Sequence, residues 1–160
     1  MYPADAAEHR GAQVHRVWWN EPDRPLTLTE PERGPWVLPQ ATKALDAITG
    51  EVLLIGKSLG SYVSTLAAER GFPAIWLTPV LTADWVVSGL RRSTAPFLLV
   101  GGTADPLWDS ALARELTPYV LEVPEADHGM YVPGRLAESA AVLGQVATAV
   151  EDFLDQVVWP

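Results

Sequence analysis

The feature that most constrains the fold of this chain is a serine that stands between two glycines at the end of an apolar run. Residues 51–60 read EVLLIGKSLG, and an amphipathic stretch follows directly. The apolar run predicts a buried strand, and the stretch after it predicts a helix. At a tight turn between such elements the flanking side chains must be very small, and Gly56 and Gly60 provide that space. The pattern therefore predicts a strand, a sharp turn that exposes Ser58, and a helix.

Short apolar runs alternate with helix-like segments along the rest of the chain. Strands are predicted at residues 14–19, 52–55, 74–78, 97–100 and 119–123. Helices are predicted at residues 4–10, 41–48, 59–70, 110–116 and 136–157, with Gly71 closing the third of them. Residues 22–39 are rich in proline and charge and show no period, which predicts a long irregular loop.

This alternation is typical of an α/β fold. Crossovers between parallel strands place helices on both faces of a sheet, so we expect a three-layer α/β/α sandwich around a mainly parallel sheet of about five strands. The chain has 160 residues, of which 48% are hydrophobic, and this is enough for one core. Residues 1–160 are therefore interpreted as a single domain.

Composition argues against several classes of protein. The net charge of -9 repels nucleic acid and anionic membrane surfaces, so neither is an expected partner. The chain has no cysteine, and its three histidines lack the spacing of paired ligands, so no metal and no cofactor are expected. Residues 1–11 contain no apolar run typical of a signal peptide, which favours a cytoplasmic location.

Two residues further along the chain have the chemistry that Ser58 needs. A serine hydroxyl is a weak nucleophile and requires a base, which a carboxylate must hold in the right tautomer. Asp105 lies just past the predicted strand at residues 97–100, and His128 lies just past the one at residues 119–123. Because the carboxyl ends of parallel strands meet at one edge of a sheet, we expect these three side chains to converge.

The G-x-S-x-G turn and the order Ser58, Asp105, His128 resemble the α/β-hydrolase family, in particular its small cap-less esterases and its dienelactone-hydrolase-like members. The resemblance covers residues 14–160. It implies a reduced α/β-hydrolase fold with Ser58 as nucleophile, His128 as base and then acid, Asp105 as its partner, and the Leu59 amide as one oxyanion donor. Dienelactone-type members often have cysteine at the nucleophile position, so serine favours ordinary ester or thioester hydrolysis.

One part of the family pattern is missing. In the family, a second oxyanion amide follows a strand that precedes the one matching residues 14–19, and this chain shows no such strand. The resemblance thus implies a domain without the N-terminal strands, whether as a fragment, a trimmed sequence or a minimal form. If residues 14–19 take the vacant place, the amides near Asn20 are expected to supply the second donor. A homodimer is another way to shield an exposed strand edge.

Several residues have two interpretations. Asp109 is a second candidate for the orienting carboxylate, whereas Asp127 is interpreted as a solvated loop charge. The G-K-S sequence at residues 56–58 is also found in phosphate-binding loops, but the count from Gly50 is one residue too long and the intervening run is strand-like, which argues against this. Four residues could line an acyl pocket or belong to the core: Trp85, Trp108, Met130 and Tyr131.

Two functions of different classes follow from these observations. The first is a serine hydrolase that cleaves a small carboxylic ester or thioester through an acyl-enzyme. Residues 79–95, where larger relatives insert a cap, are too short for one, which favours small or flexible substrates. The second is a weakly active or inactive hydrolase-like domain that binds a ligand or a protein.

Overall fold

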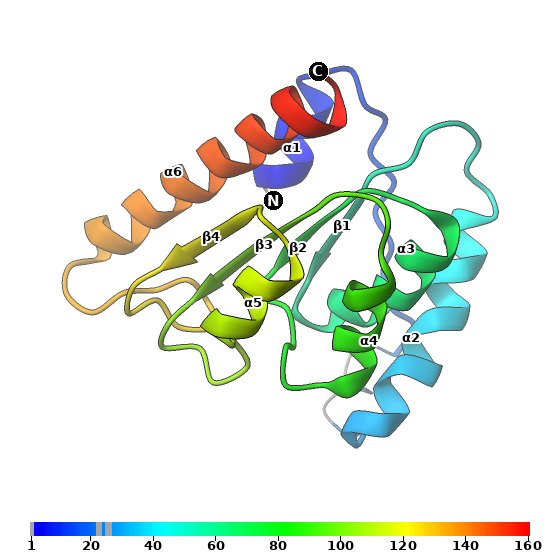
Figure 1. The fold of residues 1–160 in the computed structure, drawn as a ribbon, viewed down its shortest axis with the longest axis horizontal. Coiled ribbons are helices and arrows are strands. Elements are labelled where there is room, and N and C mark those ends of the chain that lie inside the picture. The colour runs from blue at the N-terminus through cyan, green and yellow to red at the C-terminus, as the bar shows by residue number, and fades with distance from the viewer. Residues whose placement is uncertain (1, 22–23, 25–26) are drawn as a thin grey trace.

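The computed structural model describes residues 2–21, 24 and 27–160, and its centre is a parallel β-sheet (Figure 1). The strands lie in the order in which they occur along the chain, and each pairs with the next in parallel. They are β1 (Leu54–Lys57), β2 (Ala74–Leu77), β3 (Phe97–Gly102) and β4 (Val120–Val123). The α/β class and the parallel sheet are confirmed, but the sheet has four strands among the described residues, where five were expected.

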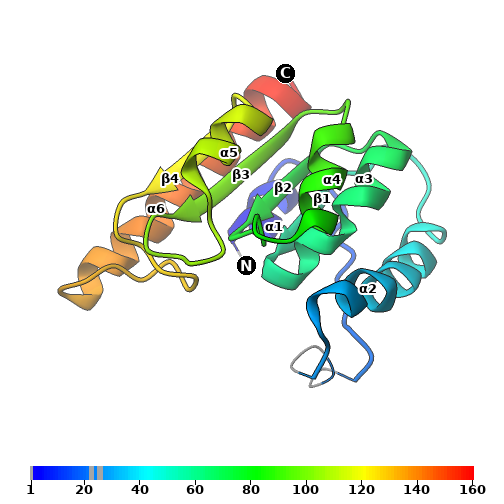
Figure 2. The ribbon, with the colours of Figure 1, turned by 60° about the horizontal axis from the view of Figure 1, so that its bottom comes forward.

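Helices cover both faces of this sheet (Figures 1 and 2). One face packs against α1 (Tyr2–Glu8), α6 (Leu136–Phe153) and the short π-helix η3 (Leu154–Val158). The other packs against α2 (Glu30–Leu45), the 3₁₀-helix η2 (Ser58–Val63), α3 (Ser64–Arg70), α4 (Asp84–Arg92) and α5 (Ser110–Leu116). The predicted helix at residues 59–70 is therefore divided between η2 and α3, and Gly71 ends it with a φ of 65° as expected.

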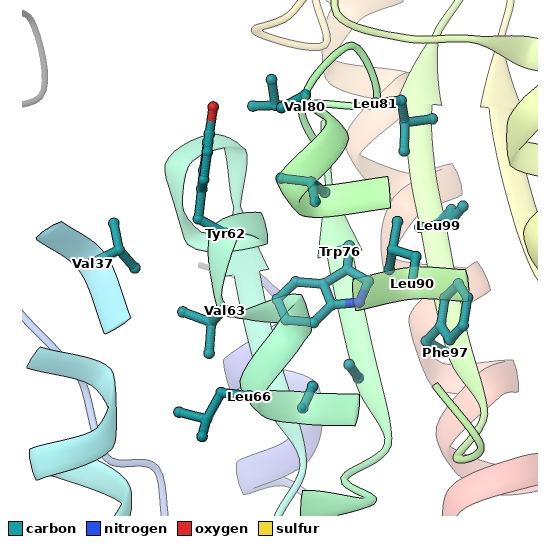
Figure 3. Close-up of a cluster of buried hydrophobic side chains, with 14 of the residues drawn as sticks. Val37, Tyr62, Val63, Leu66, Trp76, Val80, Leu81, Leu90, Phe97 and Leu99 are labelled. Carbon is teal, nitrogen blue, oxygen red and sulfur yellow. The ribbon is translucent and has the colours of Figure 1, made fainter. Parts of the chain in front are cut away.

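The two cores follow from the alternation of side chains along buried strands. In β2, Ala74 and Trp76 belong to the cluster under α2 to α5, whereas Ile75 and Leu77 belong to the cluster under α1 and α6. Figure 3 shows the indole of Trp76 in the middle of the first cluster, with Val63 on one side. All four β2 residues are buried, as expected for a strand with helices on both faces.

Residues 14–19 do not form the predicted strand. They have no secondary structure and, among the described residues, no backbone hydrogen bond to β1. The end of the segment is held by α2 instead, because Trp19 packs on Trp36 with ring centroids 6.1 Å apart and the Asn20 amide donates to Gln40 Oε1 at 2.8 Å. β-propensity produces a strand only where a partner edge is within hydrogen-bonding reach.

The loop expected at residues 22–39 is largely helical. Residues 22, 23, 25 and 26 lie outside the described part of the chain, but α2 begins at Glu30. A capping box between Thr29 and Glu32 starts the helix, and Pro35 and Pro39 both lie on its exposed side, where water can satisfy the carbonyls that they leave unpaired. The helix is stabilised by its buried side, formed by Gly34, Val37, Ala41 and Leu45.

Helix α4 was not predicted, although its residues lie in the segment recognised as too short for a cap. It packs tightly on α3 at Gly89, where an added Cβ would lie 2.4 Å from Ser64 Oγ and 2.5 Å from the Thr65 amide nitrogen. A glycine here lets two helix backbones approach closely, at the cost of helix propensity.

Gly89→Ala is therefore expected to lower the free energy of unfolding by about 1–3 kcal/mol, because the new methyl group has no room against the α3 backbone. The matched control is Gly144→Ala on the exposed side of α6, where no atom lies within 4 Å of the added Cβ. That change is expected to raise stability by up to about 1 kcal/mol. Urea unfolding of the two variants measures both effects, and equal stabilities would contradict the close contact.

Candidate active site

Ser58 lies directly after β1, at a turn with an unusual backbone conformation. Its φ is 48°, a region that residues with a side chain rarely adopt. Gly56 is required here, since an added Cβ would meet the Trp76 ring at 2.7 Å. Gly60 is not required in the same way, because no described atom lies within 4 Å of its added Cβ. The expectation that both glycines relieve crowding is thus confirmed for Gly56 and wrong for Gly60.

A continuous hydrogen-bonded chain joins the three side chains that the sequence singled out. His128 Nε2 lies 2.8 Å from Ser58 Oγ, and His128 Nδ1 lies 2.7 Å from Asp105 Oδ2. The Asp105 side chain is fully buried and the imidazole is about one-third exposed, at 34%. When Nδ1 keeps its proton and donates it in a hydrogen bond to the carboxylate, Nε2 is left as the acceptor that faces the serine hydroxyl. The arrangement can therefore withdraw a proton from Ser58.

Local hydrogen bonds fix the position of Asp105. Its second carboxylate oxygen, Oδ1, accepts from the Leu107 amide at 2.9 Å, and its own amide donates to the Gly102 carbonyl at 3.1 Å. The loop also packs closely on the next one, since a Cβ on Gly102 would lie 2.1 Å from the Ala126 carbonyl oxygen. The other candidate carboxylate, Asp109, caps α5 by accepting from the Leu112 amide.

Asp127 has a structural task at the site that the sequence analysis did not assign to it. Its Oδ1 accepts from the amides of Gly129 and Tyr131 at 2.8 and 2.9 Å, which folds the loop that presents His128. The interpretation as a solvated charge was therefore incomplete. The signal was available, because an aspartate two residues before a glycine is typical of a turn closed by the side chain.

Lys57 connects three of the loops that follow strands. Its Nζ donates to Thr78 Oγ1 at 3.3 Å and to the His128 carbonyl at 3.2 Å. Thr78 is fully buried with a φ of 42°, which is strained for a β-branched residue. A second link is Ser61, whose hydroxyl donates to the Ser58 carbonyl at 2.7 Å and accepts from the Val80 amide at 3.1 Å. These contacts hold the serine turn and the histidine loop in register.

The two predicted oxyanion donors are placed differently. Leu59 is the second residue of η2, and the first amides of a helix have no acceptor within the helix. Asn20 lies beside α2, and its amide already donates to Gln40 Oε1. No hydrogen bond among the described residues joins Asn20 to Ser58, Asp105 or His128. The Asn20 amide is therefore not free to donate to an oxyanion.

The aromatic and methionine side chains near the strand ends are mostly packed. Trp108 and Met130 are buried in the two different core clusters, and the Trp108 indole donates to Glu122 Oε2 at 2.7 Å. Trp85 packs on the first cluster and donates to the Tyr62 carbonyl, while Tyr131 is exposed. Of these four side chains, Tyr131 alone has most of its surface exposed to solvent.

In the described part of the chain, no three histidine or acidic side chains are grouped as they would be around a metal ion. None of the helices there has the length and hydropathy to span a bilayer. Comparison with models of known protein families gives no match, and neither does comparison with curated protein sequences. The function is therefore argued from the geometry of the site.

Proposed function

We propose that this protein is a serine hydrolase of the α/β-hydrolase type that cleaves small carboxylic esters or thioesters. The observation that supports the proposal is the unbroken chain from Ser58 Oγ through the His128 imidazole to the buried Asp105 carboxylate, with distances of 2.8 and 2.7 Å. Both distances are in the range at which a base activates a serine. The arrangement matches the order of roles in the Ser-His-Asp mechanism.

The mechanism follows from the positions of these groups. Ser58 Oγ attacks the carbonyl carbon of the ester while its proton passes to His128 Nε2, and the negative charge on the carbonyl oxygen is stabilised by the Leu59 amide. The tetrahedral intermediate collapses when the alcohol or thiol leaves with the proton from Nε2. Water then attacks the acyl-enzyme and gives a proton to Nε2. The carboxylic acid is released when Nε2 returns this proton to Ser58 Oγ, which restores the starting state.

The substrate class follows from the openness of the site. The His128 side chain is 34% exposed, and α4 fills the segment in which larger relatives of the proposed family have a cap. An uncovered site gains little specificity from enclosure. We therefore expect turnover of short or flexible acyl groups, such as that of p-nitrophenyl acetate.

Labelling by a fluorophosphonate probe tests the proposal directly. The wild-type protein is expected to react with one equivalent of probe, because Ser58 attacks phosphorus and fluoride leaves. Ser58→Ala is expected to remain unlabelled. Ser88→Ala, which changes an exposed serine on α4, is the matched control and should label like the wild type. Equal labelling of the Ser58 and Ser88 variants would contradict the proposal.

Lys57 is proposed as a positioning residue for His128. Lys57→Met is expected to lower kcat on p-nitrophenyl acetate by about 10–100-fold with little change in KM. The substitution removes the hydrogen bond from Lys57 Nζ to the His128 carbonyl, so the imidazole is less precisely placed. Lys57→Arg, which keeps a donor, should recover part of the loss. Lys43→Met on the exposed side of α2 is the control for loss of a charge. Loss of thermal stability with unchanged kcat would show a merely structural role.

One observation favours the alternative of a binding domain with weak or no activity. The Asn20 amide, which the resemblance implies as a second oxyanion donor, is engaged by Gln40 and is not free for that role. Loss of one such donor commonly costs about 10²–10³ in turnover. A folded protein that is neither labelled by the probe nor active on p-nitrophenyl acetate would favour this alternative.

A further inference from the structure

A large groove runs along the free edge of the sheet. β1 is the edge strand, and a cavity of about 860 Å³ lies beside it. Residues 51–57 form one side of the groove and residues 10–19 form the other. In Figure 1, residues 11–21 run from the end of α1, near the C-terminus, to the start of α2, where the strands end. The two sides of the groove thus run in the same general direction.

Both sides present backbone groups that can pair with a strand. The Leu54 amide donates to the Pro73 carbonyl on the β2 side at 3.0 Å. Because successive residues of a strand point to opposite sides, the amide and carbonyl groups of Leu53, Ile55 and Lys57 point away from β2 and into the groove. On the other side, residues 13–19 make no backbone-to-backbone hydrogen bond within the described chain. An unpaired edge of this kind is a template for another strand.

The groove lies between two apolar layers. Ala41, Leu45 and Ile48 contribute to it from the core cluster under α2 to α5. Ala7 and Trp159 contribute to it from the cluster under α1 and α6. A strand between these layers would meet apolar side chains on both faces, so it must itself be apolar at successive positions rather than at alternate ones. Polar strands would leave unpaired groups in the groove.

The volume gives the length of such a strand. One residue in a sheet occupies roughly 160 Å³, from a rise of about 3.3 Å, a strand spacing of about 4.8 Å and a layer thickness of about 10 Å. A cavity of about 860 Å³ therefore accommodates about five residues. This is close to the length of β1 itself, which has 4 residues.

Charged side chains along the groove favour particular charges at the two ends of a strand bound in it. Along the groove lie Arg16 and Lys57 against a single carboxylate, Glu51, whereas the third cation there, Arg10, is already paired with Asp155 and Glu151. Glu51 precedes the start of β1 and Lys57 ends it. Neither forms an ion pair with a described residue, and Lys57 Nζ donates only to the neutral oxygens of Thr78 and the His128 carbonyl among these residues, so its charge is not neutralised. An acidic residue is thus favoured beside Lys57 and a basic one beside Glu51, as in a strand parallel to β1 with an acidic carboxyl end.

We propose that this groove is a docking site for a β-strand of another polypeptide: a run of about five apolar residues, preceded by a basic and followed by acidic residues, that pairs in parallel with β1. Residues 14–19 of a second copy are disfavoured, because they bring Arg16 and no acidic side chain to a groove that is already positive. The inference concerns binding alone and does not depend on the hydrolase proposal.

Two synthetic peptides provide the test. The probe is acetyl-Lys-Ser-Val-Leu-Val-Leu-Val-Asp-Asp-amide, and the control has the same composition with the charged ends exchanged. Fluorescence anisotropy of labelled peptides is expected to show saturable one-to-one binding of the probe and about three- to tenfold weaker binding of the control. Methylation of alternate backbone nitrogens of the probe should weaken binding at least tenfold, because it removes the donors that pair with the edges.

A protein variant tests the location. Gly60 lines the groove, and no described atom lies within 4 Å of an added Cβ, so the first carbon of a side chain has room there. Gly60→Leu is expected to weaken probe binding at least tenfold, while Gly144→Leu on α6 leaves it unchanged. Hydrogen exchange at the Leu53 and Ile55 amides should slow at least tenfold in wild-type protein when the probe binds.

The proposal is overturned if the methylated probe binds as tightly as the parent peptide, if Gly60→Leu binds it with wild-type affinity, or if no saturable binding occurs. Slow exchange at Leu53 and Ile55 in monomeric protein without peptide would show that residues 14–19 close the groove themselves. The same slow exchange in a peptide-free dimer would assign the groove to a second copy. Either result would exclude an external strand.

Discussion

Replacement of His128 by alanine is expected to lower kcat/KM on p-nitrophenyl acetate by about 10⁵–10⁶. The imidazole lies between Ser58 Oγ and the Asp105 carboxylate, so in the proposed mechanism its removal leaves the serine without a base and the leaving group without an acid. Because the side chain is one-third exposed, at 34%, the variant should unfold at nearly the wild-type temperature. Steady-state kinetics and thermal unfolding together separate loss of chemistry from loss of fold.

The matched control is His9→Ala, which removes an exposed histidine in the turn directly after α1. Its activity should equal that of the wild type. Asp105→Asn should lower kcat by about 10⁴ if the carboxylate sets the tautomer of the imidazole. If His128→Ala keeps more than a tenth of the wild-type activity, the proposed mechanism is wrong, whatever the substrate.

Replacement of Trp76 by alanine is expected to have the largest effect on stability, a loss of about 3–5 kcal/mol in the free energy of unfolding. The indole is 2% exposed and lies in the middle of the core cluster shown in Figure 3. It also fills the space over Gly56, with the ring 2.7 Å from the position of an added Cβ. A cavity at this place would therefore loosen both the core and the turn that presents Ser58.

Trp18→Ala is the control for this change, because the Trp18 side chain is 82% exposed. Its effect on stability should lie within about 0.5 kcal/mol. Guanidinium unfolding of the two variants, followed by circular dichroism, measures the difference. A loss of less than about 1 kcal/mol for Trp76→Ala would mean that the core cluster does not depend on this side chain.

Most of the sheet was predictable because its signals are local. The strands that became β2, β3 and β4 are short apolar runs closed by turn residues, and such runs are recognisable without knowledge of their partners. The same holds for Gly71 at the end of α3, whose φ of 65° few other residues adopt easily. The parallel arrangement followed from the helices between the runs.

Two of the errors in secondary structure have a common cause. Residues 14–19 have strong β-propensity, but tertiary contacts of Trp19 and Asn20 with α2 keep the end of the segment away from β1. Conversely, α2 contains Pro35 and Pro39, and it is helical because its other side is buried against η2. In both cases long-range contacts outweigh local preference.

The sequence by itself determined the serine turn after an apolar strand and the placement of Asp105 and His128 just past two later strands, since periodicity and turn chemistry depend on neighbouring residues. Only the tertiary structure decided that Asp105 rather than Asp109 faces His128, that Lys57 and Asp127 hold the loops, and that β1 is left as an open edge. These outcomes depend on distances between residues far apart in the chain. A one-dimensional pattern does not contain such distances, because they result from the packing of whole elements against one another.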